Sequence, residues 1–477
     1  MRRLLRLGVM ALCASLIAGA ASAQDRVHQV LDVALDPGTG RVGVKAEVTP
    51  QGESREIEFL LHARLTITHA SPAVRELRAG NVAWLGDIEG GEAQQAPAVK
   101  RYAVTLPSAG ATFRVEYAGV FDFALSDARE EYTRGFRSTP GLVSATGVYL
   151  PGASAWYPLV GRALVTFDMA VTQPATWRVV SEGVGTSRDA DGRARWASTD
   201  PIDQIHLVGG PLQVTTQAAG AVEAQVYLHE VDAALSSKYL AATAQHLEMY
   251  RGLIGPYPYG KFALVENFWE TGYGMPSFTL LGPQIIRFPF IITSSYPHEI
   301  LHNWWGNSVF VDEARGNWSE GLTAYVADHL MQEQRGEDAV YRRSTLQKYR
   351  DYVGAAQDFP LVEFRGRHSA ATEAVGYGRT MMGFHTLRRM VGDEAFRRFL
   401  ARFYRDYKGK RASFDDVRTT MEAVSGRNLA RFFEDWIARP GAPALAVAVA
   451  GVSRSGTGFV VEGTVSQTQD GAPFAVD

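Results

Sequence analysis

The pattern of apolar and polar positions divides the chain into three parts. From about residue 24 to residue 228, short segments such as 42–48 and 113–117 alternate apolar with polar side chains. Glycine, proline, aspartate and serine residues separate these segments. A side-chain period of two with frequent turn residues is typical of β-strands. We therefore expect an N-terminal antiparallel β domain over residues 24–228.

The second part, residues 229–440, has mostly the apolar spacing of helices. Apolar residues recur at helical spacing from Ala233 to Leu253, and a short buried strand is expected at 262–265. Ser413 with Asp416 three residues later resembles a capping box, which marks a helix start. Further helices are expected at 321–334, 338–349, 378–391, 393–407 and 414–424.

The third part begins after a Pro-Gly-Ala-Pro sequence at 440–443. Strand-like patterns return at 444–450 and 458–465. So few strands do not make a stable sheet alone, so we expect residues 441–477 to be part of a C-terminal β domain. The predicted fold class is therefore multidomain α+β.

The first 23 residues have the pattern of a secretory signal peptide. Three arginines lie within the first six residues, an apolar run covers 7–18, and Ala21-Ser22-Ala23 fits a cleavage site. A membrane anchor is disfavoured because the apolar run is short and polar residues follow at once. The only cysteine, Cys13, lies inside this segment, so the mature chain would have no disulfides or cysteine ligands. We expect a periplasmic or secreted protein without stable membrane insertion.

The overall composition is that of a globular protein. Apolar residues make up 46% of the chain, and the formal net charge is −3. This balance argues against a nucleic-acid partner. The most basic segment, 397–411, alternates with apolar residues at helical spacing and predicts a solvated helix face. The sequence leaves the oligomeric state open.

The strongest chemical signal is the sequence His298-Glu299-Ile300-Leu301-His302. Two histidines four positions apart lie on one face of a helix, so both imidazoles can reach one metal ion. Glu299 is then placed to take a proton from water. The alternative is an amphipathic helix with packed histidines, but Glu320 opens the next helix-like segment at suitable range. Three protein ligands with one open position indicate a catalytic zinc site.

A wider set of residues carries a family resemblance. It comprises His298-Glu299-x-x-His302-x-Trp304-x-Gly306-Asn307, Trp318-Ser319-Glu320-Gly321, and segments at 255–265, 377–396 and 432–443. This set resembles the gluzincin aminopeptidases, the alanyl aminopeptidase family that includes the leukotriene hydrolases. The resemblance implies a thermolysin-like catalytic domain over residues 229–440, a Zn²⁺ cofactor and a peptide substrate.

The resemblance also implies roles for individual residues. His298, His302 and Glu320 would be the zinc ligands, and Glu299 the general base. Tyr377 would donate a hydrogen bond to the tetrahedral oxyanion, a role that suits a neutral donor beside a metal. Without the resemblance, Tyr377 is one of 19 tyrosines.

Two departures from the family pattern concern the metal segment. The spacing between His302 and Glu320 is 17 residues, whereas the family has 18, and a loop deletion absorbs this difference. Pro297 directly precedes His298, and proline is accepted only in the first helical turn. The metal-binding helix should therefore start near Ser294 or Ser295. Asp328 could orient a ligand, but a solvated helix position is the expectation for it.

The third departure concerns the substrate. The family carries Gly-x-Met-Glu-Asn, whose glutamate grips the free α-amine of the peptide, and this chain has Gly274, Met275, Pro276 and Ser277 at the matching positions. These four residues are the expected substrate-binding segment, but they lack the carboxylate. Glu266 and Glu270 could replace it, although structural or exposed positions are the expectation for both. The prediction is an aminopeptidase-like zinc peptidase. The alternatives are a zinc hydrolase without free-amine recognition, endopeptidase-like or with a non-peptide substrate, and a decayed zinc-binding protein.

Overall fold

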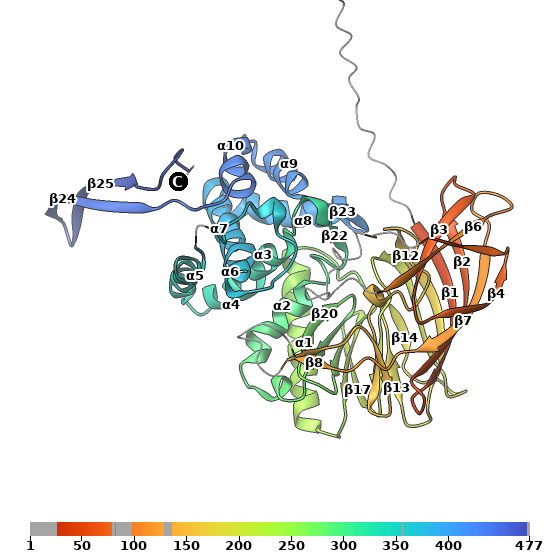
Figure 1. Cartoon of the computed structure of the whole chain (residues 1–477). Helices are drawn as coiled ribbons and strands as arrows, with labels where there is room; N and C mark the ends of the chain where they lie inside the picture. The colour runs from red at the N-terminus through yellow and green to blue at the C-terminus, as the bar shows by residue number, and fades with distance from the viewer. Residues whose placement is uncertain (1–25, 79–81, 83–97, 128–135, 355, 475–477) are drawn as a thin grey trace, which may run out of the picture.

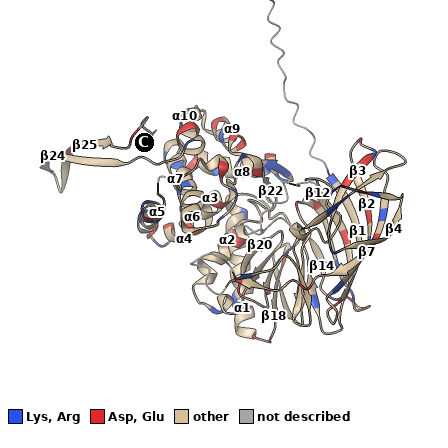
Figure 2. Cartoon of the chain, viewed as in Figure 1, with Lys and Arg blue, Asp and Glu red and all other residues tan. Residues whose placement is uncertain are grey.

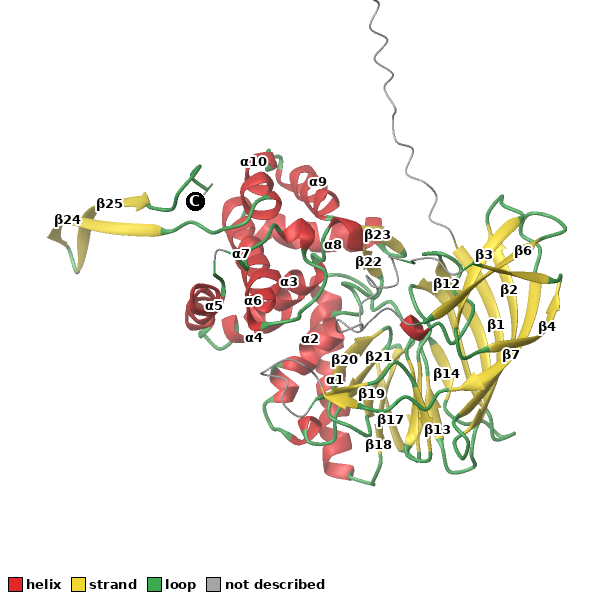
Figure 3. Ribbon diagram, in the orientation of Figure 1, coloured by secondary structure: helices red, strands yellow, loops and turns green. Residues whose placement is uncertain are grey.

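A computed structural model describes residues 26–78, 82, 98–127, 136–354 and 356–474 (Figure 1). Most strands lie on one side of the molecule and most helices on the other (Figure 3). This arrangement confirms the predicted α+β fold with an N-terminal β domain and a helical catalytic domain. The predicted signal peptide lies outside the described residues.

The largest sheet of the N-terminal domain has seven strands in the order β14-β15-β12-β1-β2-β7-β4. Their bounds are β1 (Arg26–Asp36), β2 (Arg41–Gln51), β4 (Thr66–Ser71), β7 (Phe113–Val120), β12 (Leu164–Thr172), β14 (Val184–Thr186) and β15 (Ala194–Ile202). Buried and exposed side chains alternate along β1, as the sequence pattern predicts. One pair differs from the antiparallel prediction, because β1 and β12 run parallel. The connection between them is long enough to allow this, and local periodicity carries no information on strand direction.

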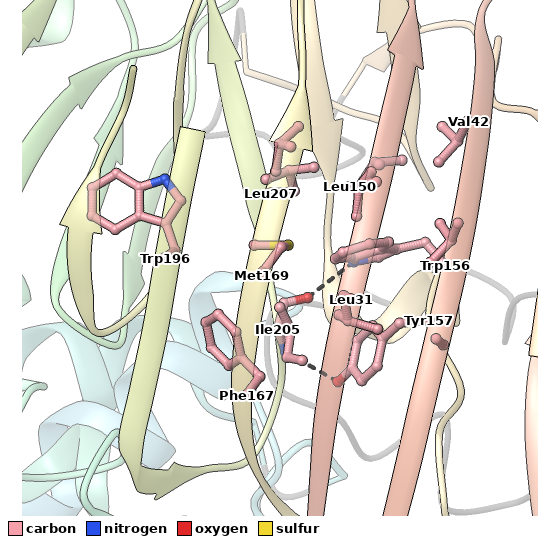
Figure 4. Close-up of a cluster of buried hydrophobic side chains, with 14 of the residues drawn as sticks. Leu31, Val42, Leu150, Trp156, Tyr157, Phe167, Met169, Trp196, Ile205 and Leu207 are labelled. Atoms are coloured by element: carbon pink, nitrogen blue, oxygen red, sulfur yellow. Dashed lines mark hydrogen bonds between the residues drawn. The ribbon is translucent and has the colours of Figure 1, made fainter. Parts of the chain in front are cut away.

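Smaller sheets complete the N-terminal domain, and two of them share a hydrophobic core with the seven-stranded sheet. They are formed by β3 (Glu56–His62), β5 (Val74–Leu77) and β6 (Val99–Thr105), by β10 (Leu142–Ser144), β11 (Gly147–Leu150), β13 (Arg178–Val180) and β16 (Leu207–Gly210), and by β8 (Ser126–Asp127) with β9 (Arg137–Ser138). Trp156 and Tyr157 are fully buried between the layers (Figure 4). Their polar atoms hold the Ile205 peptide: Trp156 Nε1 donates to Ile205 O at 3.0 Å, and Ile205 N donates to Tyr157 Oη at 3.0 Å.

A five-stranded sheet, in the order β17-β18-β19-β21-β20, begins the catalytic region. Its strands are β17 (Gln213–Ala219), β18 (Val222–Leu228), β19 (Lys261–Glu266), β20 (Gly272–Met275) and β21 (Phe278–Leu281). Helix α1 (Ala233–Leu253) has the predicted bounds and packs against β17 and β18. Because β18 pairs with β19, we propose to place the domain boundary between β16 and β17, earlier than the predicted residue 228.

The helices of the catalytic region follow the sheet. They are α2 (Ser295–Leu301), α3 (Ser319–Thr323), α4 (Leu330–Glu333), α5 (Asp338–Tyr352), α6 (Ala370–Glu373), α7 (Thr380–Val391), α8 (Asp393–Tyr407), α9 (Phe414–Ser425) and α10 (Ala430–Phe433), with π-helical turns η6 (Ala324–His329), η8 (Ala374–Arg379) and η9 (Glu434–Ala438). Short 3₁₀ turns are η2 (Gly152–Ser154), η3 (Ile285–Arg287), η4 (Ile291–Thr293), η5 (Glu313–Arg315) and η7 (Leu361–Glu363), and β22 (Val309–Val311) pairs with β23 (Lys410–Ala412). The capping box is confirmed, since Ser413 N donates to Asp416 Oδ2 at 2.8 Å.

The chain leaves the helical domain in a hairpin of β24 (Leu445–Ser455) and β25 (Gly458–Gln467), which projects from the body in Figure 1. Most of its large apolar side chains are exposed, Phe459 to 72%. Basic and acidic residues are interspersed over both domains (Figure 2). Among the described residues, the helices are either too short or too polar to cross a lipid bilayer.

Candidate metal centre and active site

Helix α2 places the two histidines of the metal motif. It begins at Ser295, with Ser294 as its N-cap, so Pro297 falls in the first turn as predicted. Proline lacks an N–H, and at this position that group would have no partner within the helix. The helix ends at Leu301, and His302 N still donates to His298 O at 3.1 Å. Both imidazoles therefore point from one face of a single turn.

Glu320, near the start of α3, completes a triad with these histidines. The His298 and His302 Nε2 atoms lie 3.1 Å apart, and Glu320 Oε2 lies 3.5 Å and 3.4 Å from them, respectively. Ligand atoms about 2.05 Å from a tetrahedral zinc ion lie about 3.3 Å apart. The three atoms thus have the spacing that one shared zinc ion requires.

The chemistry of the three donors also fits a cation. Glu320 Oε2 is buried and has no hydrogen-bond donor among the described residues. Burial opposes ionisation of this carboxyl, but His302 and His298 hold the pKa of Glu320 well below its usual value. An ionised carboxylate and two imidazoles form a common zinc ligand set. The shorter spacing between His302 and Glu320 therefore does not prevent assembly of the triad.

The Nδ1 atoms of both histidines are held by groups outside the triad. His302 Nδ1 lies 3.0 Å from Trp305 O, and His298 Nδ1 lies 3.1 Å from Asp328 Oδ2. Because both partners accept hydrogen bonds, each Nδ1 donates and each Nε2 keeps its lone pair for a metal. The prediction for Asp328 was wrong: it is half-buried in η6 and orients His298. Asp328 lies in the π-helical turn η6, which packs against α2, and this contact between elements cannot be read from local sequence.

Tyr377 lies in a second π-helical turn, η8, and faces the triad. Its ring stacks at 6.3 Å from the ring of His298, with an interplanar angle of 15°. Close packing of α3 on α7 supports this position, because a Cβ at Gly321 would lie 2.1 Å from Thr380 Cγ2. The structure therefore brings the five residues of the predicted catalytic and metal sets together: His298, Glu299, His302, Glu320 and Tyr377.

Glu299 lies between the triad and β20. A Cβ at Gly274 would lie 2.4 Å from Glu299 Oε2, so glycine allows the carboxylate to keep this position against the strand. Burial raises the pKa of Glu299 above its usual value. Raised basicity suits a group that must take up a proton.

These residues line a cavity of about 520 Å³ that runs beside β20. β20 is the last strand of its sheet, so its outer edge has backbone groups available to an extended peptide. Three residues of the predicted substrate-binding segment, Gly274, Met275 and Pro276, line the cavity.

Ser277, the fourth, is fully buried beneath the turn between β20 and β21. Proline at position 276 and a φ of 70° at Ser277 fit the two central positions of a type II turn. Ser277 N donates to Asn303 Oδ1 at 2.7 Å, and Lys261 Nζ donates to Ser277 Oγ at 2.7 Å. The prediction that Ser277 contacts substrate is therefore corrected: it holds the turn against the metal-binding segment.

Glu266 and Glu270 have structural partners, as expected. Glu266 is buried and pairs with Arg287 at 2.6 Å, and Glu270 Oε1 accepts from Gln284 N at 2.8 Å. Neither belongs to the described residues that line the cavity. The carboxylate that Pro276 replaces is thus not supplied from this segment.

The N-terminal domain contributes a wall of the cavity that sequence reasoning missed. Asp203, Gln204 and His206 line it just before β16. No motif marks these residues, and their approach depends on the packing of two domains. The only feature of the sequence that could have drawn attention to this wall is His206, which lies just before the turn at Gly209-Gly210-Pro211.

Comparisons with known proteins agree with this geometry. Residues 292–436 match the peptidase family M1 domain. Leucine aminopeptidase 2 of Emericella nidulans is 24% identical over 43% of this chain and 36% of its own length. A leukotriene A-4 hydrolase homolog of Botryotinia fuckeliana is 23% identical over 42% of this chain and 36% of its own length. The chain thus spans less than half the length of these relatives.

Solved structures share the fold. A variant of the M1 zinc metallopeptidase from Deinococcus radiodurans, bound to a Tyr-Ser-Ala substrate, has a TM-score of 0.67 and 21% identity, covering 87% of this chain and 94% of its own. The fold and the triad agree with these matches: residues 292–436 carry a peptidase family M1 domain, and the chain is similar in fold to zinc metallopeptidases. His298, His302 and Glu320 form a donor set that fits zinc, the metal named for these neighbours.

Proposed function

We propose that the chain is a zinc-dependent peptidase that removes residues from the free amino terminus of peptides. The observation that carries this proposal is the convergence of the triad, Glu299 and Tyr377 on one cavity beside an edge strand. The similar Deinococcus structure is bound to a Tyr-Ser-Ala substrate, which supports the proposal that this cavity binds a peptide.

The residues divide the reaction between them. His298, His302 and Glu320 would hold zinc, and the bound ion would supply the Lewis acidity for the attacking water and the scissile carbonyl. Glu299 takes the proton of the attacking water and returns it to the leaving amine. Tyr377 donates a hydrogen bond to the oxyanion of the substrate, and the edge of β20 aligns the peptide.

We also propose that the protein acts in the periplasm or outside the cell. The arginine-rich start, apolar run and Ala21-Ser22-Ala23 support this location. A chain without other cysteines has no need of a particular redox compartment, so it is compatible with both locations.

Pro276 favours a second candidate, a zinc hydrolase without free-amine recognition. Such an enzyme would cleave a peptide and its N-acetylated form equally well, whereas an aminopeptidase would not cleave the blocked form. The third alternative, a decayed zinc-binding protein, gives Glu299 and Tyr377 no chemical task. Failure of the zinc-loaded protein to cleave any peptide in a broad library would support it.

The direct test of the mechanism is Glu299→Gln. Loss of a general base should lower peptide hydrolysis by about 10²- to 10⁴-fold, while zinc remains stoichiometric because Glu299 is not a ligand. Activity is measured with a peptide substrate and zinc by elemental analysis. Glu248→Gln, on an exposed face of α1, is the control. Full activity of the Glu299 variant would refute the assigned role.

A further inference from the structure

A buried glutamate–histidine pair stands in the cavity wall outside the catalytic set. Glu182 is fully buried, and its Oε1 lies 2.6 Å from His206 Nδ1. Glu182 also accepts from His206 N at 3.0 Å, and Ser181 Oγ donates to it at 2.9 Å. His206 is itself one of the residues that line the cavity.

The hydrogen bonds define what the imidazole can offer. Glu182 acts as an acceptor toward Ser181 and the backbone, so His206 Nδ1 is the donor in the shortest contact. In the neutral imidazole, the opposite nitrogen, Nε2, is then an acceptor. A carboxylate behind such a ring makes Nε2 a stronger acceptor and places a negative charge close to any cation that binds there.

The pair is rigidly supported. Ile205 precedes His206, and both of its backbone polar groups are held: its C=O by Trp156 and its N–H by Tyr157 (Figure 4). Both aromatic residues are fully buried in the core of the N-terminal domain. A binding group fixed by such a core loses little conformational freedom when its ligand arrives.

The pair also lies next to the turn that carries Pro276. Gly183, which follows Glu182, donates its N–H to Ser277 Oγ at 3.1 Å. Pro276 and His206 line the same cavity. The segment that carries Glu182 is thus hydrogen-bonded to the turn that carries Pro276, the position at which the aminopeptidase pattern would place its amine-binding glutamate.

The other acidic residues of this cavity have tasks or partners. They are Asp203, Glu299, Glu320, Asp328 and Glu373. Glu320, Asp328 and Glu299 serve the metal site, and Glu373 pairs with Lys348 at 3.4 Å and with Arg367 at 3.6 Å. Burial raises the pKa of Asp203, and the charge of Arg411 acts on the same carboxyl in the opposite direction.

We infer that His206, backed by Glu182, binds the free α-ammonium group of the peptide and replaces the carboxylate that Pro276 lacks. The inference rests on the proposed peptidase function, because it names the substrate group that this cavity selects. A hydrogen bond from the ammonium group to His206 Nε2, with Glu182 behind it, restores amine recognition from a different domain.

The test measures binding without turnover. In the zinc-loaded Glu299→Gln protein, calorimetry compares tri-alanine with N-acetyl tri-alanine. We expect tri-alanine to bind more tightly, and the added change His206→Ala to weaken its binding about 10- to 100-fold, as for loss of a hydrogen bond to a charged group. Binding of the acetylated peptide should not change. His206→Gln, whose amide oxygen can accept a hydrogen bond, should recover part of the loss.

His62→Ala is the matched control, because His62 is also a buried histidine of the same domain and lies outside the cavity lining. It should change neither affinity. If His206→Ala weakened the binding of both peptides equally, His206 would contact the peptide backbone and the inference would be overturned. The inference would also be overturned if His206→Ala left the affinity for tri-alanine unchanged, or if the parent protein bound neither peptide. If the protein bound tri-alanine more tightly than the acetylated peptide but the wild type cleaved no peptide, the peptidase proposal would be rejected and the inference on His206 would stand.

Discussion

At the scale of single residues, the metal ligands depend on their hydrogen-bond partners. Asp328 fixes the ring of His298, so Asp328→Asn should lower zinc affinity about 10- to 100-fold while the fold is retained. Competition with a chromogenic chelator measures this affinity. Asp338→Asn, at the start of α5, should leave it unchanged. Unaltered affinity of the Asp328 variant would show that the contact does not orient the ligand.

Gly274 provides a steric test of the same site. In Gly274→Ala the new methyl group would lie 2.4 Å from Glu299 Oε2, so the carboxylate must move. We expect kcat to fall about a hundredfold, because small displacements of catalytic groups have such effects. Steady-state kinetics and zinc analysis check this. Gly43→Ala in β2, where a Cβ meets no atom within 4 Å, should retain activity, and equal kinetics of the two variants would contradict the expected clash.

Sequence reasoning found the residues that a local pattern marks. His298, Glu299 and His302 lie within one helical turn, and Glu320 opens the next helix-like segment. The role of Tyr377 came from the family resemblance. The role of Asp328 was misjudged because its partner, His298, lies 30 positions away in the sequence and only the folded chain brings the two together. The Glu182–His206 pair was missed because 24 positions separate its members and only the folded β domain brings them together.

At the scale of elements, Lys261 links β19 to the turn between β20 and β21. Burial lowers the pKa of this amine from 10.5 to about 7 in the folded protein. Between these values, the unfolded chain binds more protons at Lys261 than the folded protein does. Its contribution to the free energy of unfolding should therefore rise as the pH rises from about 7 toward 10.5.

Lys261→Met should remove this pH dependence. Urea unfolding at about pH 7 and about pH 9 measures the free energy of unfolding of both proteins. We expect the difference, wild type minus variant, to shift in favour of the wild type at the higher pH. A difference that stays constant, or that shifts toward the variant, would contradict the assigned burial of the amine.

Element positions were predictable where the hydrophobic period was clear. The bounds of α1 agree with the prediction, and the segment of α3, η6 and α4 agrees within two residues. The assignment of β17 and β18 to a domain was not predictable, because strand periodicity does not reveal strand partners. The same limit explains the parallel pairing of β1 with β12.

At the scale of the whole molecule, the active site is shared by two domains. The catalytic region supplies the metal ligands, Glu299 and Tyr377, and the N-terminal domain supplies the wall that contains His206. Chemistry and substrate selection are thus separated in space. This division explains how a chain can keep the catalytic set complete while Pro276 stands in the turn of the substrate strand.

The measurement that tests the central claim most directly is cleavage-site mapping on a mixed peptide library, with amines free or acetylated and with or without chelator. We predict that the zinc-loaded protein releases residues from free amino termini only, and that chelation stops cleavage until zinc is restored. Cleavage that continues in chelator would contradict the metal mechanism. Equal cleavage of acetylated peptides would contradict recognition of the amine.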